Sequence, residues 1–253
     1  MDTSRRLQVS RTGQDGEILV MTMDRPRQRN AVDQQLADEI DAAMTELETA
    51  PGLRVGILTG GPDFFCAGTD LSLTTSPVSA AGGEYGVIRR ARTRPLIAAV
   101  EGFALGGGME IALACDLVVA AESASFGLPE AQRGVVAVCG ALFRGPEKLS
   151  PNTALELLLT NTRIDADRAH ALGMVNRVAP SGQALEWAVQ FAEEIVLSSP
   201  QAVAGTLHAV NAERARREAA AWAHTELANL HAAASTDRAE GVTAFFEKRQ
   251  PRW

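Results

Sequence analysis

Residues 95–120 read PLIAAVEGFALGGGMEIALACDLVVA, and this stretch does most to decide the fold. Residues 95–100 are nearly all apolar, which predicts a strand buried on both faces of a sheet. Three consecutive glycines, at 106–108, mark a turn. Residues 109–114 are expected to form a short buried helix, and residues 117–120 the next strand. A strand, a helix and a strand in this order indicate a parallel α/β unit.

The same alternation extends toward the N-terminus. Residues 17–23 and 55–59 are predicted strands, bounded by turn residues. Between them, residues 33–49 are expected to form an amphipathic helix with Asp33 as its N-cap. Its apolar positions recur at helical spacing, at Leu36, Ile40, Met44 and Leu47. Residues 72–84 are rich in Ser, Thr, Ala and Gly, which predicts a mobile loop.

The last third of the chain has a different pattern. Helical spacing of apolar residues predicts helices around 155–159 and 185–196, and alanine-rich helical stretches continue to residue 246. Only residues 175–178 are typical of a strand there. We therefore expect a core over residues 1–195 and a helical region over residues 196–253. Because such helices cannot bury all their apolar surface alone, we expect this region to mediate oligomerisation.

The composition is that of an ordinary globular protein. The chain has 253 residues, 46% of them hydrophobic, and a net charge of −7, which argues against nucleic acid or an anionic membrane as a partner. The N-terminus lacks a signal-peptide pattern, and the longest apolar run, 111–121, is too short to span a bilayer. A cytoplasmic location is the expectation. The three cysteines are expected to be buried or half-buried free thiols in a reducing compartment.

The glycine run and two glutamates are the candidates for chemistry. Unpaired backbone N–H groups at a helix start, free of side chains, can bind an anion or an oxyanion; close packing of the helix on a strand explains the glycines equally well. Glu110 follows in the first helical turn, among apolar neighbours, and Glu130 follows Pro129. Each glutamate alone is more often structural. Two of them at the ends of one glycine-flanked apolar segment favour a functional interpretation.

Other polar clusters favour a surface role. The four histidines lie in the last third of the chain without metal-ligand spacing, so we expect no metal site and expect surface or interface positions. Residues 89–94 contain four arginines. A solvated helix face is the favoured interpretation of this basic cluster, and contact with ligand phosphates is the alternative.

Over essentially its whole length the chain resembles the enoyl-CoA hydratase/isomerase (crotonase) superfamily. The segments that carry the resemblance occur in the expected order: residues 24–26 with Asn30-Ala31, residues 65–71 (FCAGTDL), residues 95–116, residues 126–130 (FGLPE), residues 171–176 (ALGMVN) and residues 246–249 (FEKR). The resemblance implies an α/β fold, a superhelix of ββα units with a C-terminal helical region that forms trimers. These trimers usually pair as hexamers.

The resemblance also implies an acyl-CoA thioester substrate and roles for particular residues. The backbone N–H groups of Thr69 and Gly107 would form an oxyanion hole, and Glu110 and Glu130 would exchange protons with water and the α-carbon, as in enoyl-CoA hydratases. Coenzyme A would be part of the substrate, and no separate cofactor is implied. The implied substrate-binding residues are Ala67, Gly68, Asp70, Leu71, Gly106 and Lys248, with Lys248 reaching the CoA phosphates of a neighbouring subunit.

One segment departs from the family pattern. Val138 and Ala141 stand where family hydratases usually have glycines, which predicts a bulkier pocket behind the second glutamate. Retention of both glutamates favours hydration of a trans-2-enoyl-CoA. The alternatives are isomerisation of an enoyl-CoA, dehydration of a specialised hydroxyacyl-CoA such as carnitinyl-CoA, and binding of CoA esters with little catalysis.

Overall fold

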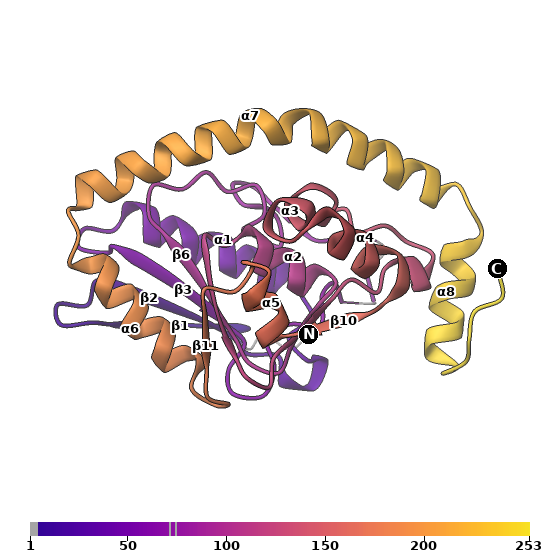
Figure 1. Cartoon of the computed structure of the whole chain (residues 1–253), viewed down its shortest axis with the longest axis horizontal. Coiled ribbons are helices and arrows are strands. Elements are labelled where there is room, and N and C mark those ends of the chain that lie inside the picture. Colours follow the sequence, from indigo (N-terminus) through magenta and orange to yellow (C-terminus); the bar gives the residue numbers. More distant parts are fainter. Residues whose placement is uncertain (1–4, 71, 74) are drawn as a thin grey trace.

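The structure, a computed structural model, describes residues 5–70, 72–73 and 75–253. Its centre is a six-stranded sheet in the order β1-β2-β3-β6-β8-β11 (Figure 1). The strands are β1 (Leu7–Thr12), β2 (Ile18–Met23), β3 (Val55–Thr59), β6 (Leu96–Val100), β8 (Leu117–Ala121) and β11 (Arg177–Ala179). β1 and β2 pair as an antiparallel hairpin, and every other pair in this sheet is parallel. The expected α/β class with parallel pairing is confirmed.

Two smaller sheets accompany the central one. The first has the order β10-β9-β7 and contains β7 (Phe103–Leu105), β9 (Ser125–Gly127) and β10 (Arg163–Asp165). The second is the hairpin of β4 (Val78–Ser79) and β5 (Gly83–Glu84). This hairpin lies within the segment 72–84 that was expected to be a loop.

Helices cover both faces of the central sheet. They are α1 (Gln34–Thr49), α2 (Gly107–Ala114), α3 (Ala141–Lys148), α4 (Pro151–Thr160), α5 (Ala166–Ala171), α6 (Ala184–Val196), α7 (Pro200–Ala233) and α8 (Asp237–Phe246), with 3-10 turns at Pro26–Gln28 and Ala131–Arg133. Asp33 caps α1 by accepting a hydrogen bond from the Leu36 N–H, as predicted. No helix in the described ranges combines the length and apolar character that crossing a membrane requires.

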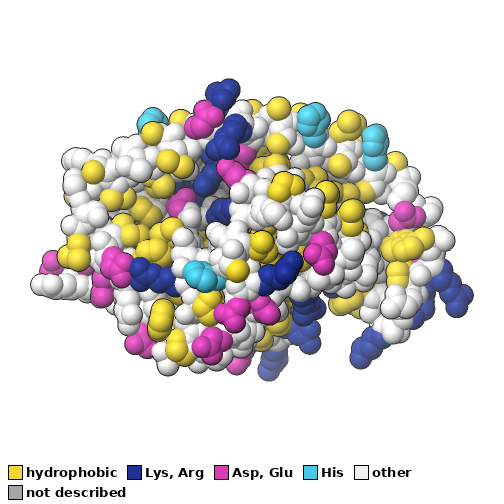
Figure 2. Space-filling model, in the orientation of Figure 1, with side chains coloured by type: hydrophobic (Ala, Val, Ile, Leu, Met, Phe, Trp, Pro, Cys, Tyr) yellow, Lys and Arg dark blue, Asp and Glu magenta, His cyan; other side chains and the backbone are white. Residues whose placement is uncertain are grey.

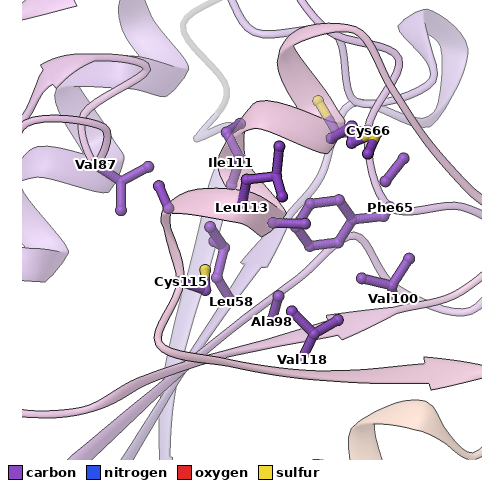
Figure 3. Packing of buried hydrophobic residues seen from close by; sticks show 14 of the residues in the cluster. Leu58, Phe65, Cys66, Val87, Ala98, Val100, Ile111, Leu113, Cys115 and Val118 are labelled. Atoms are coloured by element: carbon purple, nitrogen blue, oxygen red, sulfur yellow. The ribbon is translucent and has the colours of Figure 1, made fainter. Parts of the chain in front are cut away.

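The strands alternate their side chains between two cores because successive residues point to opposite faces. Ile18 and Val20 of β2 pack with α6 on one face, and Leu19 and Met21 pack in the larger core on the other. α2 lies in that larger core, and all eight of its residues are buried. Figure 3 shows side chains of α2, including Ile111, beside Phe65 and the sheet residues. The helix that begins with the glycine run is therefore rigidly placed.

The long helix α7 arches over the core, and α8 lies at its far end (Figure 1). In α7 the buried residues are Glu218 and Thr225, so most of the helix faces outward. Figure 2 shows hydrophobic, charged and histidine side chains mixed along this outer side. α7 contacts the core through Trp222, whose ring meets Phe143 edge-on at 4.8 Å, and through the ion pair between Glu218 and Arg144. The division at residue 195 stays a prediction.

Candidate active site

The N-terminus of α2 presents unpaired backbone N–H groups to the site. Gly106 precedes the helix with φ +56°, a conformation that an L side chain rarely adopts. Gly107 is the first helical residue, and a methyl group built on it would lie 2.3 Å from the Tyr85 hydroxyl. The glycines therefore allow a side chain, and a ligand, to approach the helix start closely. The helix dipole adds partial positive charge at the same point.

A second backbone segment runs beside this helix start. Gly68 has φ +98°, and a methyl group built on it would lie 3.0 Å from the Gly107 amide nitrogen. The next residue, Thr69, forms a parallel β-bridge with Val32. The hydrogen bonds of this bridge are made by the residues on either side of Thr69: the Val32 N–H donates to the Gly68 carbonyl, and the Asp70 N–H donates to the Val32 carbonyl. Neither the Thr69 N–H nor the Gly107 N–H donates a hydrogen bond to another residue in the described part of the chain. Two free donors thus lie on adjacent backbone segments.

Glu110 is a buried carboxylate held by backbone donors. Its side chain is 2% exposed, and Oε1 accepts hydrogen bonds from the Cys139 N–H at 2.7 Å and the Ala141 N–H at 3.1 Å. Burial raises the pKa of Glu110 to about 7, against the opposing effect of these two donors. The segment in which the sequence departs from the family pattern therefore does more than fill the pocket, because its backbone fixes Glu110.

Glu130 is a second buried carboxylate, and it has fewer partners. It follows β9 and Pro129, and its Oε2 has no hydrogen-bond partner among the described residues. Its Oε1 lies 2.8 Å from the position of a methyl group built on Gly106. Burial raises the pKa of Glu130 to about 8, and the negative charge of Glu110 adds to the rise. The two carboxyls therefore lie close enough for the charge of Glu110 to affect the ionisation of Glu130.

One cavity of about 370 Å³ brings these groups together. Thr69, Glu110 and Glu130 line it, so the structure brings the two sequence-predicted acid/base candidates into one cavity with Thr69, a predicted oxyanion-hole residue. The sequence did not single out any of its other polar lining residues as a site residue; they are Thr75, Ser76, Glu84, Tyr85, Arg133, Cys139, Asn229 and Arg238. Asn229 and Arg238 come from the C-terminal helical region, and no local sequence signal links that region to the glycine run.

The predicted substrate-binding residues are placed unevenly. Asp70 lines the cavity, and its carboxylate lies 3.0 Å from Arg25, whose guanidinium contributes to lowering the pKa of Asp70. Ala67 is half-buried and donates its N–H to the Arg29 carbonyl. Lys248 is exposed just beyond α8 and does not line this cavity. Leu71 lies outside the described residues.

The basic cluster at 89–94 forms neither a helix face nor a site with free cations. Residues 89–94 lie outside any helix or strand, and their guanidinium groups bind within the protein. Arg90 pairs with Asp41 at 2.5 Å, Arg92 pairs with Asp116 at 2.8 Å, and Arg94 donates to the Ala50 carbonyl. The interpretation as a solvated helix face was wrong, because acidic and carbonyl oxygens distant in sequence satisfy these arginines.

A larger cavity of about 560 Å³ lies between α7 and residues 88–93, and among its described lining residues there is no pair of carboxylates. Its carboxylate, Glu218, binds Arg144 through both oxygens at 2.8 Å. The four histidines are exposed and the three cysteines are buried free thiols, as predicted. The cavity with two carboxylates is therefore the candidate active site. Backbone donors beside paired carboxyls can polarise a carbonyl and transfer protons to the carbons next to it.

The comparisons with known proteins agree with this geometry. The model of the enoyl-CoA hydratase/isomerase family matches residues 13–253. The chain is 39% identical over 245 residues to mevalonyl-coenzyme A hydratase of Aspergillus fumigatus, covering 93% of this chain and 91% of that protein. It is 35% identical over 249 residues to carnitinyl-CoA dehydratase of Proteus mirabilis, covering 94% and 95%.

Solved structures give the same result. A carnitinyl-CoA hydratase from Mycobacterium avium superposes with a TM-score of 0.90 at 37% identity, over 99% of both chains. The enoyl-CoA hydratase EchA1 from Mycobacterium marinum is 42% identical and superposes with a TM-score of 0.78, again over 99% of both chains. These two relatives and two solved structures thus carry CoA-thioester hydratase or dehydratase names.

Proposed function

Since the chain belongs to the enoyl-CoA hydratase/isomerase family, we propose that it is an enoyl-CoA hydratase, which adds water across the double bond of a trans-2-enoyl-CoA. The observation that carries the proposal is the meeting of Glu110, Glu130 and the free Thr69 N–H in one cavity. Isomerisation by a single acid would leave one of the two carboxylates without a role.

In the proposed reaction, the N–H groups of Thr69 and Gly107 bind the thioester oxygen. This polarises the enoyl group, makes the β-carbon electrophilic and stabilises the enolate that forms when water attacks. One of Glu110 and Glu130 removes a proton from the water, and the other delivers a proton to the α-carbon. Burial favours a shared proton on the pair, because two carboxylates in one apolar site disfavour each other's ionisation.

The remaining predicted residues keep proposed roles. Ala67, Gly68, Asp70, Leu71 and Gly106 would lie along the coenzyme A part of the substrate, and Lys248 would reach CoA phosphates across a subunit boundary. A homotrimer, or a hexamer of two trimers, in the cytoplasm is part of the same proposal. Exposed apolar side chains in the C-terminal helical region support it, including Leu227, Leu230 and Phe246.

Dehydration of a 3-hydroxyacyl-CoA is the second candidate function. It is the reverse of hydration and uses the same two carboxylates with their proton states exchanged. The name of one relative, carnitinyl-CoA dehydratase, favours it.

Loss of the absorbance of a conjugated enoyl thioester tests the proposal. Crotonyl-CoA and longer trans-2-enoyl-CoAs should lose this absorbance when the protein is added, and the product should be the 3-hydroxyacyl-CoA by mass. Binding of these thioesters without any absorbance loss would instead identify a CoA-ester-binding protein with little catalysis. Absorbance that remains unchanged at every chain length therefore contradicts the hydratase proposal.

The pH dependence of kcat/KM follows from the raised pKa values of the pair. The active form has one proton on the two carboxyls. Activity should rise as pH increases through about 7, when the first proton leaves, and fall above about 8, when the second leaves. Initial rates measured from roughly pH 5 to 10 check this profile. An acidic limb near pH 4.5, the ordinary glutamate value, would contradict the apolar environment of the pair.

A further inference from the structure

Three hydroxyl groups form a cluster on one wall of the proposed active site. The Tyr85 hydroxyl lies 2.7 Å from Thr69 Oγ1 and 3.2 Å from Ser76 Oγ, and Thr69 Oγ1 lies 3.3 Å from Ser76 Oγ. All three residues line the cavity that contains Glu110 and Glu130. We call Thr69, Ser76 and Tyr85 the hydroxyl cluster. None of its side-chain hydroxyls has a role in the proposed hydration, which uses the Thr69 backbone alone.

The cluster is held in place by its surroundings. Tyr85 is 2% exposed, has φ +55° and donates its N–H to the Pro77 carbonyl. Its hydroxyl reaches the start of α2, where only a glycine at position 107 leaves room for it. Cys139 Sγ lies 3.3 Å from Ser76 Oγ, and the Cys139 N–H binds Glu110. The cluster is therefore connected to the proposed catalytic carboxylate through one residue.

The hydrogen-bond capacity of the cluster favours a ligand that donates. Three hydroxyls carry three O–H donors and six acceptor lone pairs. When each hydroxyl donates to the next around the triangle, all donors are used, and the Cys139 thiol donates to Ser76 as well. In that arrangement, acceptor positions remain spare and donors do not. A substrate hydroxyl can donate to such a site, whereas a hydrocarbon leaves the buried acceptors unpaired.

The rest of the cavity limits the size and charge of the acyl group. The other walls include Leu73, Val78, Val136, Val138 and Val242, which are apolar. A volume of about 370 Å³ is near the lower end for a small-molecule site, so a short acyl group fits it. A carboxylate on the acyl chain cannot donate to the cluster.

We propose that the acyl group of the substrate is short and carries a hydroxyl, additional to the reacting double bond, that donates a hydrogen bond to the hydroxyl cluster. This inference rests on the proposed function, because it concerns the acyl end of the same thioester. It makes Tyr85 and Ser76 residues that determine substrate specificity. It also gives the side-chain hydroxyls of Tyr85 and Ser76 a role in a cavity whose carboxylates are assigned to the chemistry.

Binding of unreactive saturated thioesters tests the inference apart from catalysis. Calorimetric titration should show that 4-hydroxypentanoyl-CoA or 5-hydroxypentanoyl-CoA binds about tenfold more tightly than pentanoyl-CoA, the effect of one good hydrogen bond. Tyr85→Phe and Ser76→Ala should each remove most of this preference and leave the affinity for pentanoyl-CoA unchanged. Ser79→Ala is the matched control, because Ser79 is a buried serine on the neighbouring hairpin that does not line the cavity.

The outcomes separate the inference from the proposed function. Equal affinity for the plain and hydroxylated thioesters in the wild-type protein overturns the inference, whether or not enoyl-CoA is hydrated. An equal loss of affinity for both thioesters in Tyr85→Phe and Ser76→Ala also overturns it. That result would indicate that the cluster contacts the thioester carbonyl or a water molecule instead of a substrate hydroxyl. A retained preference without hydration of any enoyl-CoA would overturn the hydratase proposal and support the inference. Should Tyr85→Phe fold poorly, Ser76→Ala alone decides.

Discussion

Replacing Glu110 with Gln, or Glu130 with Gln, is expected to lower kcat for crotonyl-CoA hydration by about a thousandfold, because positioned proton transfer contributes roughly 10²–10⁴ in rate. Glutamine conserves the volume of the side chain but cannot take or deliver the proton. In Glu110→Gln the amide oxygen still accepts from the Cys139 and Ala141 N–H groups. The fold should therefore survive, and butanoyl-CoA, a saturated analogue, should bind with about its wild-type affinity.

Glu101→Gln provides the matched control for both variants. Glu101 is also a buried glutamate, 4% exposed, and it accepts hydrogen bonds from the Gly182 and Ala184 N–H groups. None of these three residues lines the cavity. This variant should keep the wild-type kcat if it folds. Full activity in either Glu110→Gln or Glu130→Gln would rule out the two-carboxylate mechanism. Equal losses in all three variants would indicate damage to the fold instead.

Gly107→Ala is expected to lower kcat/KM by about a hundredfold to a thousandfold, the usual effect of losing one oxyanion donor. The new methyl group would lie 2.3 Å from the Tyr85 hydroxyl, inside any normal contact distance. Either Tyr85 or the start of α2 must move, and the Gly107 N–H then no longer points where the thioester oxygen develops charge. Steady-state kinetics with crotonyl-CoA measure the loss.

Gly205→Ala is the control for a glycine within a helix. Gly205 lies in α7 with no atom within 4 Å of an added methyl group, so alanine should stabilise the helix slightly and leave activity unchanged. Wild-type kcat/KM in Gly107→Ala would show that the close approach at the start of α2 has no part in catalysis. Thermal melting of both variants separates unfolding from a local loss of the donor.

The sequence predicted the elements whose apolar pattern is long or continuous. The strands at 55–59 and 96–100, and the helices that begin at Gln34 and Gly107, followed from periodicity, capping and the glycine run. It did not predict β7, β9 and β10, because each is three residues long and three residues are too few to show a repeating hydrophobic pattern. Nor did it predict β1, in which polar residues alternate irregularly at the sheet edge.

The site could be predicted only where its residues are close in sequence or match the family segments. Glu110 and Gly107 lie in one helical turn, and Glu130 follows within the same family pattern. Tyr85 was missed, although it is the only tyrosine of the chain, because its approach to Gly107 depends on the path of residues 72–84. Asn229 and Val242 were missed because about one hundred residues separate them from the carboxylates that they face across the cavity.

The attachment of α7 and α8 has a consequence for how such an enzyme changes over time. Glu110 belongs to α2 in the buried core, where a substitution disturbs close packing and reduces the stability of the fold. The cavity wall formed by Asn229, Ala233, Arg238 and Val242 belongs to helices that are mostly exposed. Mutations can reshape this wall at little cost in stability. Substrate range can thus diverge between descendants of one ancestor while the chemistry that they perform is inherited intact.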